Sequence, residues 1–264
     1  MKQLLKQLMD DLYRKNPNDL FDYYLDKFKE KIGINKYYII HKNRILYRAR
    51  KGCVDILGRH SELDIHFKMP YYKEKIGVPP ALCASSGRFN RSGYAFLYLA
   101  TNQKTCVAEI NLEVGQICSI AKYKFVGESK YLNLCDVKDE NVLVLKKFLL
   151  EPVYKENRYY YHYTQFIAEI IKKIGYHGIV FQSIQSNGIN VVSFVNPDFY
   201  CIEFSEVLMK AKKINYQIEK VEEGYQNYTQ YEKYLKYYNE FEEKEQKDLF
   251  RYLQNKINYE QNKK

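Results

Sequence analysis

Long hydrophobic runs are missing from this sequence. No uninterrupted apolar stretch among its 264 residues approaches the roughly 18 that a membrane-spanning helix requires. The opening residues, MKQLLKQLMDDLYRK, place charges on both sides of a short leucine pattern and offer no small-residue cleavage site, so we expect no signal peptide. Hydrophobic residues still make up 46% of the chain, too many for global disorder. The length suits one enzyme-sized domain with extensions or two small domains, and we expect no membrane partner.

Motifs that hold metals or disulfides are also missing. The six cysteines form no CxxC pair, and the five histidines form no HExxH or comparable constellation. Cys106, Cys118 and Cys201 lie in apolar or alternating contexts typical of a core. We therefore expect no metal site and no disulfide framework, and a reducing, cytoplasmic setting.

Acidic residues are fewer than basic ones: the chain has 32 Asp and Glu but 42 Lys and Arg, which gives a net charge of +10. Such a balance favours anionic partners: a phosphorylated metabolite, nucleic acid or an acidic protein. Richness in Lys, Asn, Ile and Tyr also follows from an AT-rich genome, so charge alone does not choose among them. The 28 tyrosines beside cations would suit a non-enzymatic module that binds single-stranded nucleic acid. The lysines are nevertheless spread along the chain between acidic residues, so we do not expect a nucleic-acid partner.

The pattern of apolar residues divides the chain into three parts. Residues 1–40 predict a helical hairpin, since Leu4, Leu8 and Leu12 recur at helical spacing and Asn16-Pro17 is typical of a second helix start. Residues 41–221 alternate short strand-like runs with helical segments, which favours an α+β domain over a repeating βαβ pattern. Residues 222–264 have helical spacing with interspersed charges and predict a C-terminal helical extension.

Within the middle part, several runs predict individual elements. Thr101 is placed to cap a short helix that ends at Glu109, and residues 139–150 and 163–174 have helical periodicity. Strands are expected over residues 37–40, 44–49, 94–99, 117–126, 178–181, 190–195 and 210–221.

The segment from Gly87 to Gly93 is the first candidate for chemistry. Its two glycines bracket Arg88 and Asn90, so the backbone can approach a ligand while the guanidinium offers a fork of donors that suits a phosphate or diphosphate. No Gly-Lys-Ser/Thr follows, and no GxGxxG opens a helix, which excludes a Walker loop and a dinucleotide fingerprint. A plain turn with a solvated arginine is the alternative interpretation.

Glu109 and the loop of residues 182–188 are the second and third candidates. Apolar neighbours suggest that the Glu109 carboxylate is partly buried, where it could stabilise positive charge on a sugar ring, although an ordinary exposed glutamate fits as well. The hydroxyl and amide side chains of the loop could line a polar pocket or merely make a turn.

The order of these segments carries more information than any one of them. The succession resembles the RES domain, a bacterial family named for its arginine, glutamate and serine, over roughly residues 44–200. The segments are Tyr47–Arg50, Gly87–Asn90, Leu97–Ala100, Thr105–Glu109 and Gly178–Ser183, followed by Asn190–Val192 and Asn196–Asp198. The resemblance implies an ADP-ribosyltransferase-like fold with a mixed β core, and an enzyme that degrades NAD by hydrolysis or phosphorolysis. Members are typically toxins of toxin–antitoxin pairs.

Position by position, the resemblance assigns two sets of residues. The catalytic set is Glu109, Arg48 and Ser183, and the substrate-binding set is Arg88, Tyr98 and Asn90. Gln182 stands where the family usually has proline before the serine, a change that affects the rigidity of the loop and leaves the hydroxyl in place. Compact members also lack both terminal helical regions.

The chemistry of the side chains agrees with this resemblance. Arg48 and Arg88 could clamp the diphosphate of NAD with charge-assisted hydrogen bonds worth about 1.5–3 kcal/mol each. Tyr98 could stack on the nicotinamide ring, Ser183 could hold the adjoining ribose or the amide, and Glu109 could stabilise the oxocarbenium-like state. NAD is then a substrate, no cofactor is required, and the acceptor is water or inorganic phosphate.

An ADP-ribosyltransferase that modifies a protein or nucleic acid remains an alternative, because it would use the same pocket. The resemblance also implies a restraining antitoxin. The terminal helices could instead serve as built-in regulators, for example in a phage-defence effector, or as the interface of a homo-oligomer.

Overall fold

The computed structural model describes residues 1–33, 37–60, 63–153, 159–194, 198–214 and Asn255. The chain divides into a unit of residues Met1–Ile214 and a second unit of residues Asn215–Lys264. The predicted C-terminal extension, residues 222–264, lies outside the described residues apart from Asn255, and so does the part of the last expected strand beyond residue 214.

Two helices open the first unit, as the leucine spacing predicts. Helix α1 spans Lys2–Arg14 and buries its leucine stripe, and α2 spans Pro17–Ile32. The side chain of Asn16 accepts a hydrogen bond from the Asn18 backbone N–H at 3.0 Å, and Gly33 ends α2 with φ +65°. Both termini are thus formed by the residues whose types favour these positions.

The middle of the unit is built on a large sheet of nine strands in which all pairs but one are antiparallel. Its strand order is β1-β7-β8-β9-β5-β2-β6-β10, with β11 also paired to β6, and the parallel pair is β7 with β8. The strands are β1 (Tyr37–Ile39), β2 (Ile45–Lys51), β5 (Leu97–Ala100), β6 (Ile117–Phe125), β7 (Lys130–Asn133), β8 (Gly178–Gln182), β9 (Ile189–Ser193), β10 (Phe199–Cys201) and β11 (Val207–Lys210). The predicted α+β class is confirmed.

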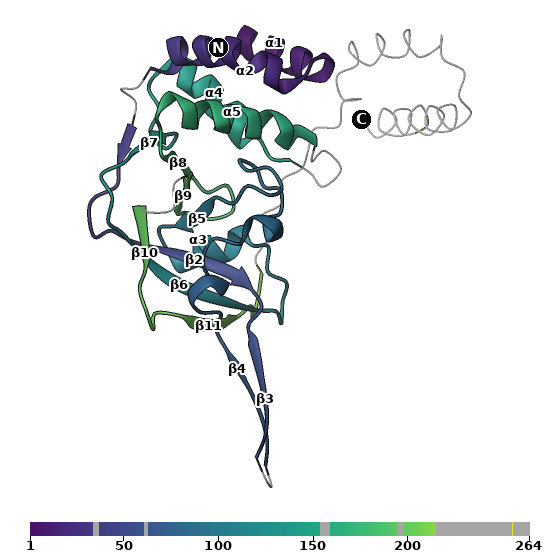
Figure 1. Ribbon diagram of the computed structural model, residues 1–264, viewed down its shortest axis with the longest axis vertical. Coiled ribbons are helices and arrows are strands. Elements are labelled where there is room, and N and C mark those ends of the chain that lie inside the picture. The colour runs from purple at the N-terminus through teal and green to yellow at the C-terminus, as the bar shows by residue number, and fades with distance from the viewer. Residues whose placement is uncertain (34–36, 61–62, 154–158, 195–197, 215–254, 256–264) are drawn as a thin grey trace. The chain divides into compact units, whose positions relative to one another are not determined.

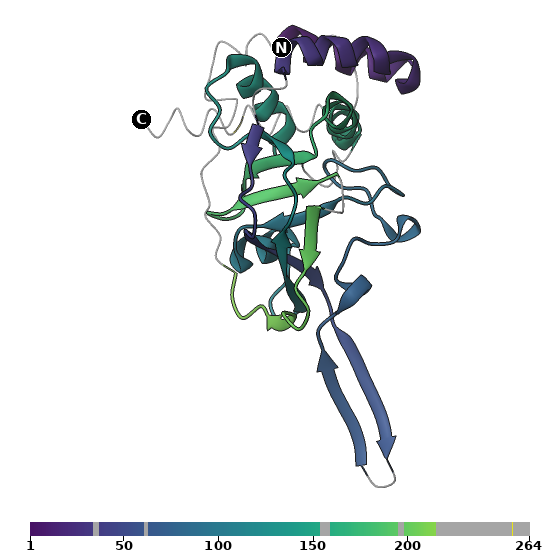
Figure 2. The same cartoon turned by 60° about the vertical axis from the view of Figure 1, so that its left-hand side comes forward.

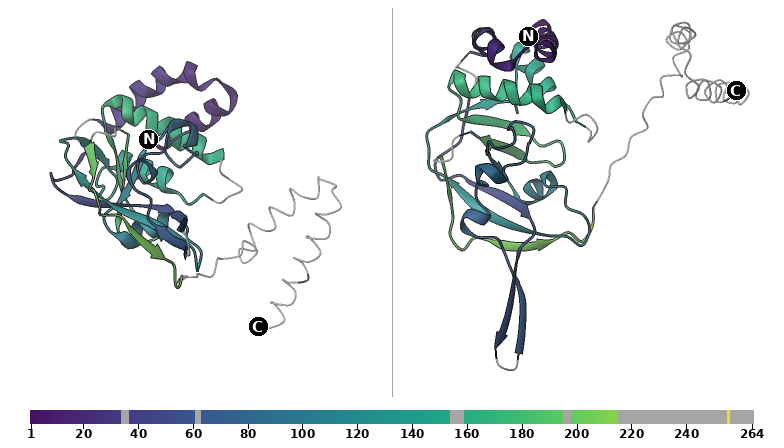
Figure 3. Two further views of the ribbon diagram at one scale, coloured as in Figure 1. Left: turned by 60° about the horizontal axis from the view of Figure 1, so that its bottom comes forward. Right: turned by 45° about the vertical axis from the view of Figure 1, so that its right-hand side comes forward.

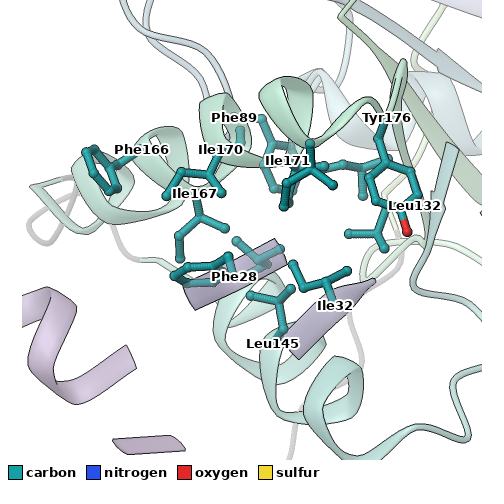
Figure 4. Packing of buried hydrophobic residues seen from close by; sticks show 14 of the residues in the cluster. Phe28, Ile32, Phe89, Leu132, Leu145, Phe166, Ile167, Ile170, Ile171 and Tyr176 are labelled. Carbon is teal, nitrogen blue, oxygen red and sulfur yellow. The ribbon is translucent and has the colours of Figure 1, made fainter. Parts of the chain in front are cut away.

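Helices cover one end of this sheet in layers. Helices α4 (Glu140–Leu150) and α5 (Tyr161–Ile174) lie between the N-terminal helices and strands β7, β8 and β9 (Figures 1 and 3). Their buried faces join the N-terminal helices in one apolar cluster that includes Phe28, Leu145, Phe166 and Ile171 (Figure 4). The helical hairpin is therefore part of the main core. Short helix α3 (Gln103–Glu109) follows β5, with 3₁₀ turns at Lys73–Lys75 and Ala81–Cys83 before that strand.

Strands β3 (Val54–His60) and β4 (Leu63–Met69) form a separate two-stranded ribbon that projects from the sheet as an arm (Figures 1 and 2). Ser119 of β6 fastens its base: its hydroxyl donates to the carbonyl of Gly52 at 2.9 Å and accepts from the backbone N–H of Tyr71 at 2.8 Å. The sequence analysis assigned no structure to this stretch.

Some local expectations were wrong. Asn102, not Thr101, caps α3, because the Asn102 side chain accepts from the Thr105 backbone N–H at 2.9 Å while the Thr101 hydroxyl accepts from Ile189 N–H in the sheet. Strands β7 and β10 were not expected, and each is so short that its pairing partner defines it. The last strand, β11, begins before the expected segment and ends at Lys210.

Candidate active site

A pocket of about 380 Å³ lies where the turn at Gly87, strands β5 and β9, and helix α3 meet. Polar and aromatic side chains line it among apolar ones. They include Arg88, Tyr98, Glu109, Asn190 and Tyr161. One cavity thus brings together three segments that lie far apart along the chain: the turn at Arg88, strand β5 with Tyr98, and the end of helix α3 with Glu109.

Glu109 is the centre of the hydrogen bonding in this pocket. Its Oε1 accepts from the hydroxyl of Ser183 at 2.7 Å and from the Nδ2 of Asn190 at 2.7 Å. Both donors are nearly buried, with exposures of 7% and 5%. Because both bonds fall on Oε1, the carboxylate is held in one orientation. Oε2 makes no hydrogen bond within the described part of the chain and is left for a ligand.

The backbone explains why Ser183 reaches Glu109. The loop after β8 folds tightly against the start of α3: the Ser183 N–H donates to the Gly188 carbonyl at 2.8 Å, and the Thr105 hydroxyl bonds that of Ser186 at 3.1 Å. A Cβ at Gly188 would overlap the Thr105 hydroxyl and lie 2.6 Å from Nδ2 of Asn102. Only glycine permits this approach, so residue 188 fixes the distance between loop and helix.

Arg88 is held by backbone oxygens and by an aromatic ring. Its Nη1 donates to the carbonyls of Leu149 and Glu151 at 2.9 and 2.8 Å, and its guanidinium lies 5.6 Å from the ring centre of Tyr161. Burial lowers the pKa of Arg88, and the phenol of Tyr161 and the carboxylate of Glu109 oppose that shift. The guanidinium keeps its charge, as arginine does throughout proteins.

Helix α5 holds the turn that carries Arg88. The side chain of Gln165 donates to the Ser86 hydroxyl at 2.8 Å and to the Gly87 carbonyl at 2.7 Å, and the Thr164 hydroxyl donates to the Arg88 carbonyl. Both α5 side chains are buried. The turn is therefore positioned by a rigid helix.

Tyr98 lines the pocket, and Asn90 supports it from behind. The Tyr98 hydroxyl donates to Oδ1 of Asn90 at 2.8 Å, and burial raises the pKa of this phenol. The Asn90 amide group donates to the carbonyls of Ser85 and Tyr94, both at 2.9 Å. Asn90 was predicted to bind substrate. Its amide N–H groups instead donate to backbone carbonyls of the turn that contains it, and it is not among the residues that line the pocket. A Cβ at Gly87 would come within 2.6 Å of its Oδ1.

Arg48 was predicted to be a catalytic residue, but its hydrogen bonds are made to backbone carbonyls. Its Nε donates to the Ile76 carbonyl at 2.8 Å and its Nη1 to the Tyr98 carbonyl at 3.2 Å. Burial lowers its pKa, and it does not line the pocket. Its visible contacts hold strand β5 and the loop before it against β2.

The structure therefore brings together Glu109, Ser183, Arg88 and Tyr98, and places Arg48 and Asn90 behind them. Asn190 and Tyr161 also line the pocket and were not predicted from the sequence as site residues. Asn190 could have been identified, since it is the one amide side chain in the mostly apolar strand Ile189–Ser193. Tyr161 could not, because tyrosines are common throughout this chain.

Among the described residues, no group of three or more His, Cys, Asp or Glu side chains is arranged to hold a metal ion. No helix within the described ranges is long and apolar enough to cross a membrane.

Comparison with known proteins gives two similarities. A model of the RES domain family matches residues 69–209. A chain from the crystal structure of the MbcT–MbcA toxin–antitoxin complex of M. tuberculosis aligns with a TM-score of 0.41 and 12% sequence identity, covering 65% of this chain and 87% of that one. None of the curated proteins compared with the chain matches it.

Proposed function

The chain belongs to the RES domain family, and from this premise we propose that it degrades NAD by cleaving the nicotinamide–ribose bond. The observation that carries the proposal is the carboxylate of Glu109, oriented by Ser183 and Asn190 at 2.7 Å each, in the same pocket as Arg88 and Tyr98. A fixed negative charge in a partly closed pocket is what an oxocarbenium-like transition state requires.

The reaction needs few groups from the protein. The electron pair of the C–N bond leaves with nicotinamide, which departs neutral because its ring nitrogen was cationic. The ribose carbon takes up positive charge, and Oε2 of Glu109 would stabilise it or align a ribose hydroxyl. Water or inorganic phosphate then adds to the carbon and loses a proton, which gives ADP-ribose or its phosphate.

The remaining side chains would bind and orient. Arg88 would face the diphosphate with its remaining donors, and the rings of Tyr98 and Tyr161 would enclose the nicotinamide end. Ser183 and Asn190 would act through Glu109. We assign Arg48 and Asn90 to positioning, because their hydrogen bonds run to carbonyls and to Tyr98.

An enzyme that consumes NAD harms the cell that makes it. We therefore propose that the chain acts as a toxin or defence effector and that a separate antitoxin, or another regulator, covers the pocket. A culture that expresses the wild-type chain should lose NAD and stop growing, whereas one that expresses Glu109→Gln should do neither.

The direct test is to incubate the purified protein with NAD, with and without phosphate, and to identify the products by chromatography and mass. Free nicotinamide with ADP-ribose or its phosphate supports the proposal. NAD labelled on the adenine would leave its label on a protein or nucleic acid if the chain were instead an ADP-ribosyltransferase. Unchanged NAD would contradict the proposed degradation, and unchanged NAD with a cell lysate added as a source of acceptors would contradict both.

A further inference from the structure

A second, larger hollow adjoins the pocket. This groove has a volume of about 1050 Å³ and runs between α1 and α4. Its size is close to the upper end of the range for small-molecule sites. Helix α1 lies outside residues 69–209, so one wall of the groove is made by a part of the chain that the family model does not match.

The groove and the pocket share part of their walls. Pro152 and Ile184 line both of them, and Ser183, which donates to Glu109, lines the groove as well. The side chain of Ile184 is 57% exposed, so no packed layer of core separates the two spaces at this point. A ligand longer than the pocket could therefore extend past Ile184 into the groove.

Charge distinguishes the two spaces. In the pocket, Arg88 is the lining cation and Glu109 the lining anion, so their formal charges cancel. Among the residues that the structure describes, the groove is lined by the cations Lys2, Lys6, Lys146 and Lys147 and by the single anion Glu151. Lys146 is engaged with the Cys135 carbonyl at 2.9 Å. The others are exposed, and Lys2 and Lys6 are one helical turn apart on the same face of α1. The groove thus complements an anion more strongly than the pocket does.

Aromatic and thioether groups form the apolar part of the groove. The rings of Phe148 and Tyr160 lie 5.8 Å apart, and the Tyr160 hydroxyl is 3.9 Å from the sulfur of Met9. Leu5, Val144 and Leu150 complete this surface. Flat apolar walls beside cations are suited to a planar base that carries phosphate.

We infer that this groove is the subsite for the adenosine half of the substrate dinucleotide. The inference rests on the proposed function and extends it. Nicotinamide and its ribose occupy the pocket, the diphosphate passes Ile184 toward Lys2, Lys6 and Lys147, and the purine lies against Phe148 and Tyr160. The N-terminal helix is then a specificity element for the dinucleotide.

The test uses the double variant Lys2→Glu/Lys6→Glu in the full chain. Both residues lie in the first turns of α1, where no acidic residue occurs in the wild type, so glutamates there favour the helix and the variant should fold. The matched control is Lys27→Glu/Lys173→Glu, which reverses the same charge at two exposed lysines outside the groove.

Kinetics with two substrates separates the halves. For NAD, the KM of the double variant should rise about tenfold, with kcat changed less than about twofold, because exposed charges act on binding. Cleavage of nicotinamide riboside, which lacks both phosphates and the adenosine, should be unaffected. The control variant should match the wild type with both substrates. An unchanged KM for NAD in the double variant, in a protein that does cleave NAD, would overturn the inference while leaving the proposed function standing.

A binding measurement tests the subsite without any turnover. Calorimetry on the Glu109→Gln protein should detect AMP binding, and Lys2→Glu/Lys6→Glu should weaken it by about tenfold. If this result is obtained and the wild-type chain leaves NAD intact, the subsite holds and the proposed function fails. AMP that does not bind, or that binds without competing with NAD, overturns the subsite.

Discussion

Among single residues, Glu109 carries the strongest prediction. Glu109→Gln keeps the side chain's shape and its acceptor for Ser183 but removes the negative charge, so the rate of NAD loss should fall by about 10²–10³. The measurement is the initial rate by chromatography, with thermal unfolding followed by circular dichroism to show an intact fold. Glu113→Gln is the control, since Glu113 is exposed and contacts Gln116 outside the pocket. Full turnover in Glu109→Gln would remove this carboxylate from the mechanism.

A second prediction for a single residue concerns Gly188. Gly188→Ala forces a methyl group onto Thr105 and Asn102, so the loop must move and Ser183 must shift away from Glu109. We expect a loss of stability of about 1–3 kcal/mol, measured by denaturant unfolding, together with lower activity. Gly77→Ala is the control, because a Cβ there would meet its nearest atom at an ordinary 3.5 Å. If Gly188→Ala and Gly77→Ala lose the same amount of stability, the close approach at Gly188 does not contribute to the free energy of unfolding.

The sequence motifs identify most of the residues of the site but not the hydrogen-bond partners that each side chain has in the folded protein. The motifs located Glu109, Ser183, Arg88 and Tyr98, all of which meet at the pocket or its loop. The same motifs do not predict which backbone carbonyls accept hydrogen bonds from a given side chain. Arg48 binds the Ile76 carbonyl, 28 residues further along the chain, and no local pattern encodes that contact.

Among the elements, the packing of α1 on α2 depends on a polar contact as well as on leucines. The buried Tyr24 hydroxyl donates to Oδ2 of Asp11 at 2.6 Å, and Lys15 pairs with the same carboxylate at 2.8 Å. Hydrogen bonds from Lys15 and then Tyr24 lower the pKa of Asp11 below its ordinary value.

This contact gives a prediction with a defined dependence on pH. A carboxyl whose pKa is lowered by folding stabilises the folded state above its ordinary pKa, and this contribution is lost as the pH falls through the lowered value. In Tyr24→Phe, the pKa of Asp11 should rise toward its ordinary value in an NMR titration. The difference in stability from the wild type should be largest near neutral pH and should shrink in acid. Tyr23→Phe, at an exposed neighbouring ring, should leave the titration of Asp11 where it is.

Elements with their own periodicity or caps were predictable, and those defined by distant pairing were not. The helix at residues 140–150 begins after Asp139, whose side chain caps it, and the Asn16-Pro17 signal was equally local. Strand β7 exists because Tyr131 pairs with Gly178 across the parallel step, a contact that spans two intervening helices. Short strands of this kind are specified by the sheet they join.

For the first unit as a whole, the arm should behave apart from the body. A two-stranded ribbon is marginally stable in water, and among the described elements β3 and β4 pair only with each other. We expect the backbone amides of residues 54–57 and 66–69 to exchange with solvent much faster than those of β2 and β6, because local opening of the arm leaves the body folded. Hydrogen exchange followed by mass spectrometry measures both. Equal protection in arm and body would show that the two open together.

The position of the arm in the chain order has a consequence for how the polypeptide can be divided. Strand β2 precedes the arm, and its sheet neighbours β5 and β6 follow it. A cut at the tip would therefore leave two fragments interleaved in a single sheet, with the first fragment also contributing both N-terminal helices to the shared core. Co-expressed as separate genes, the two halves should find each other and reconstitute the enzyme, whereas neither alone should accumulate as a folded protein.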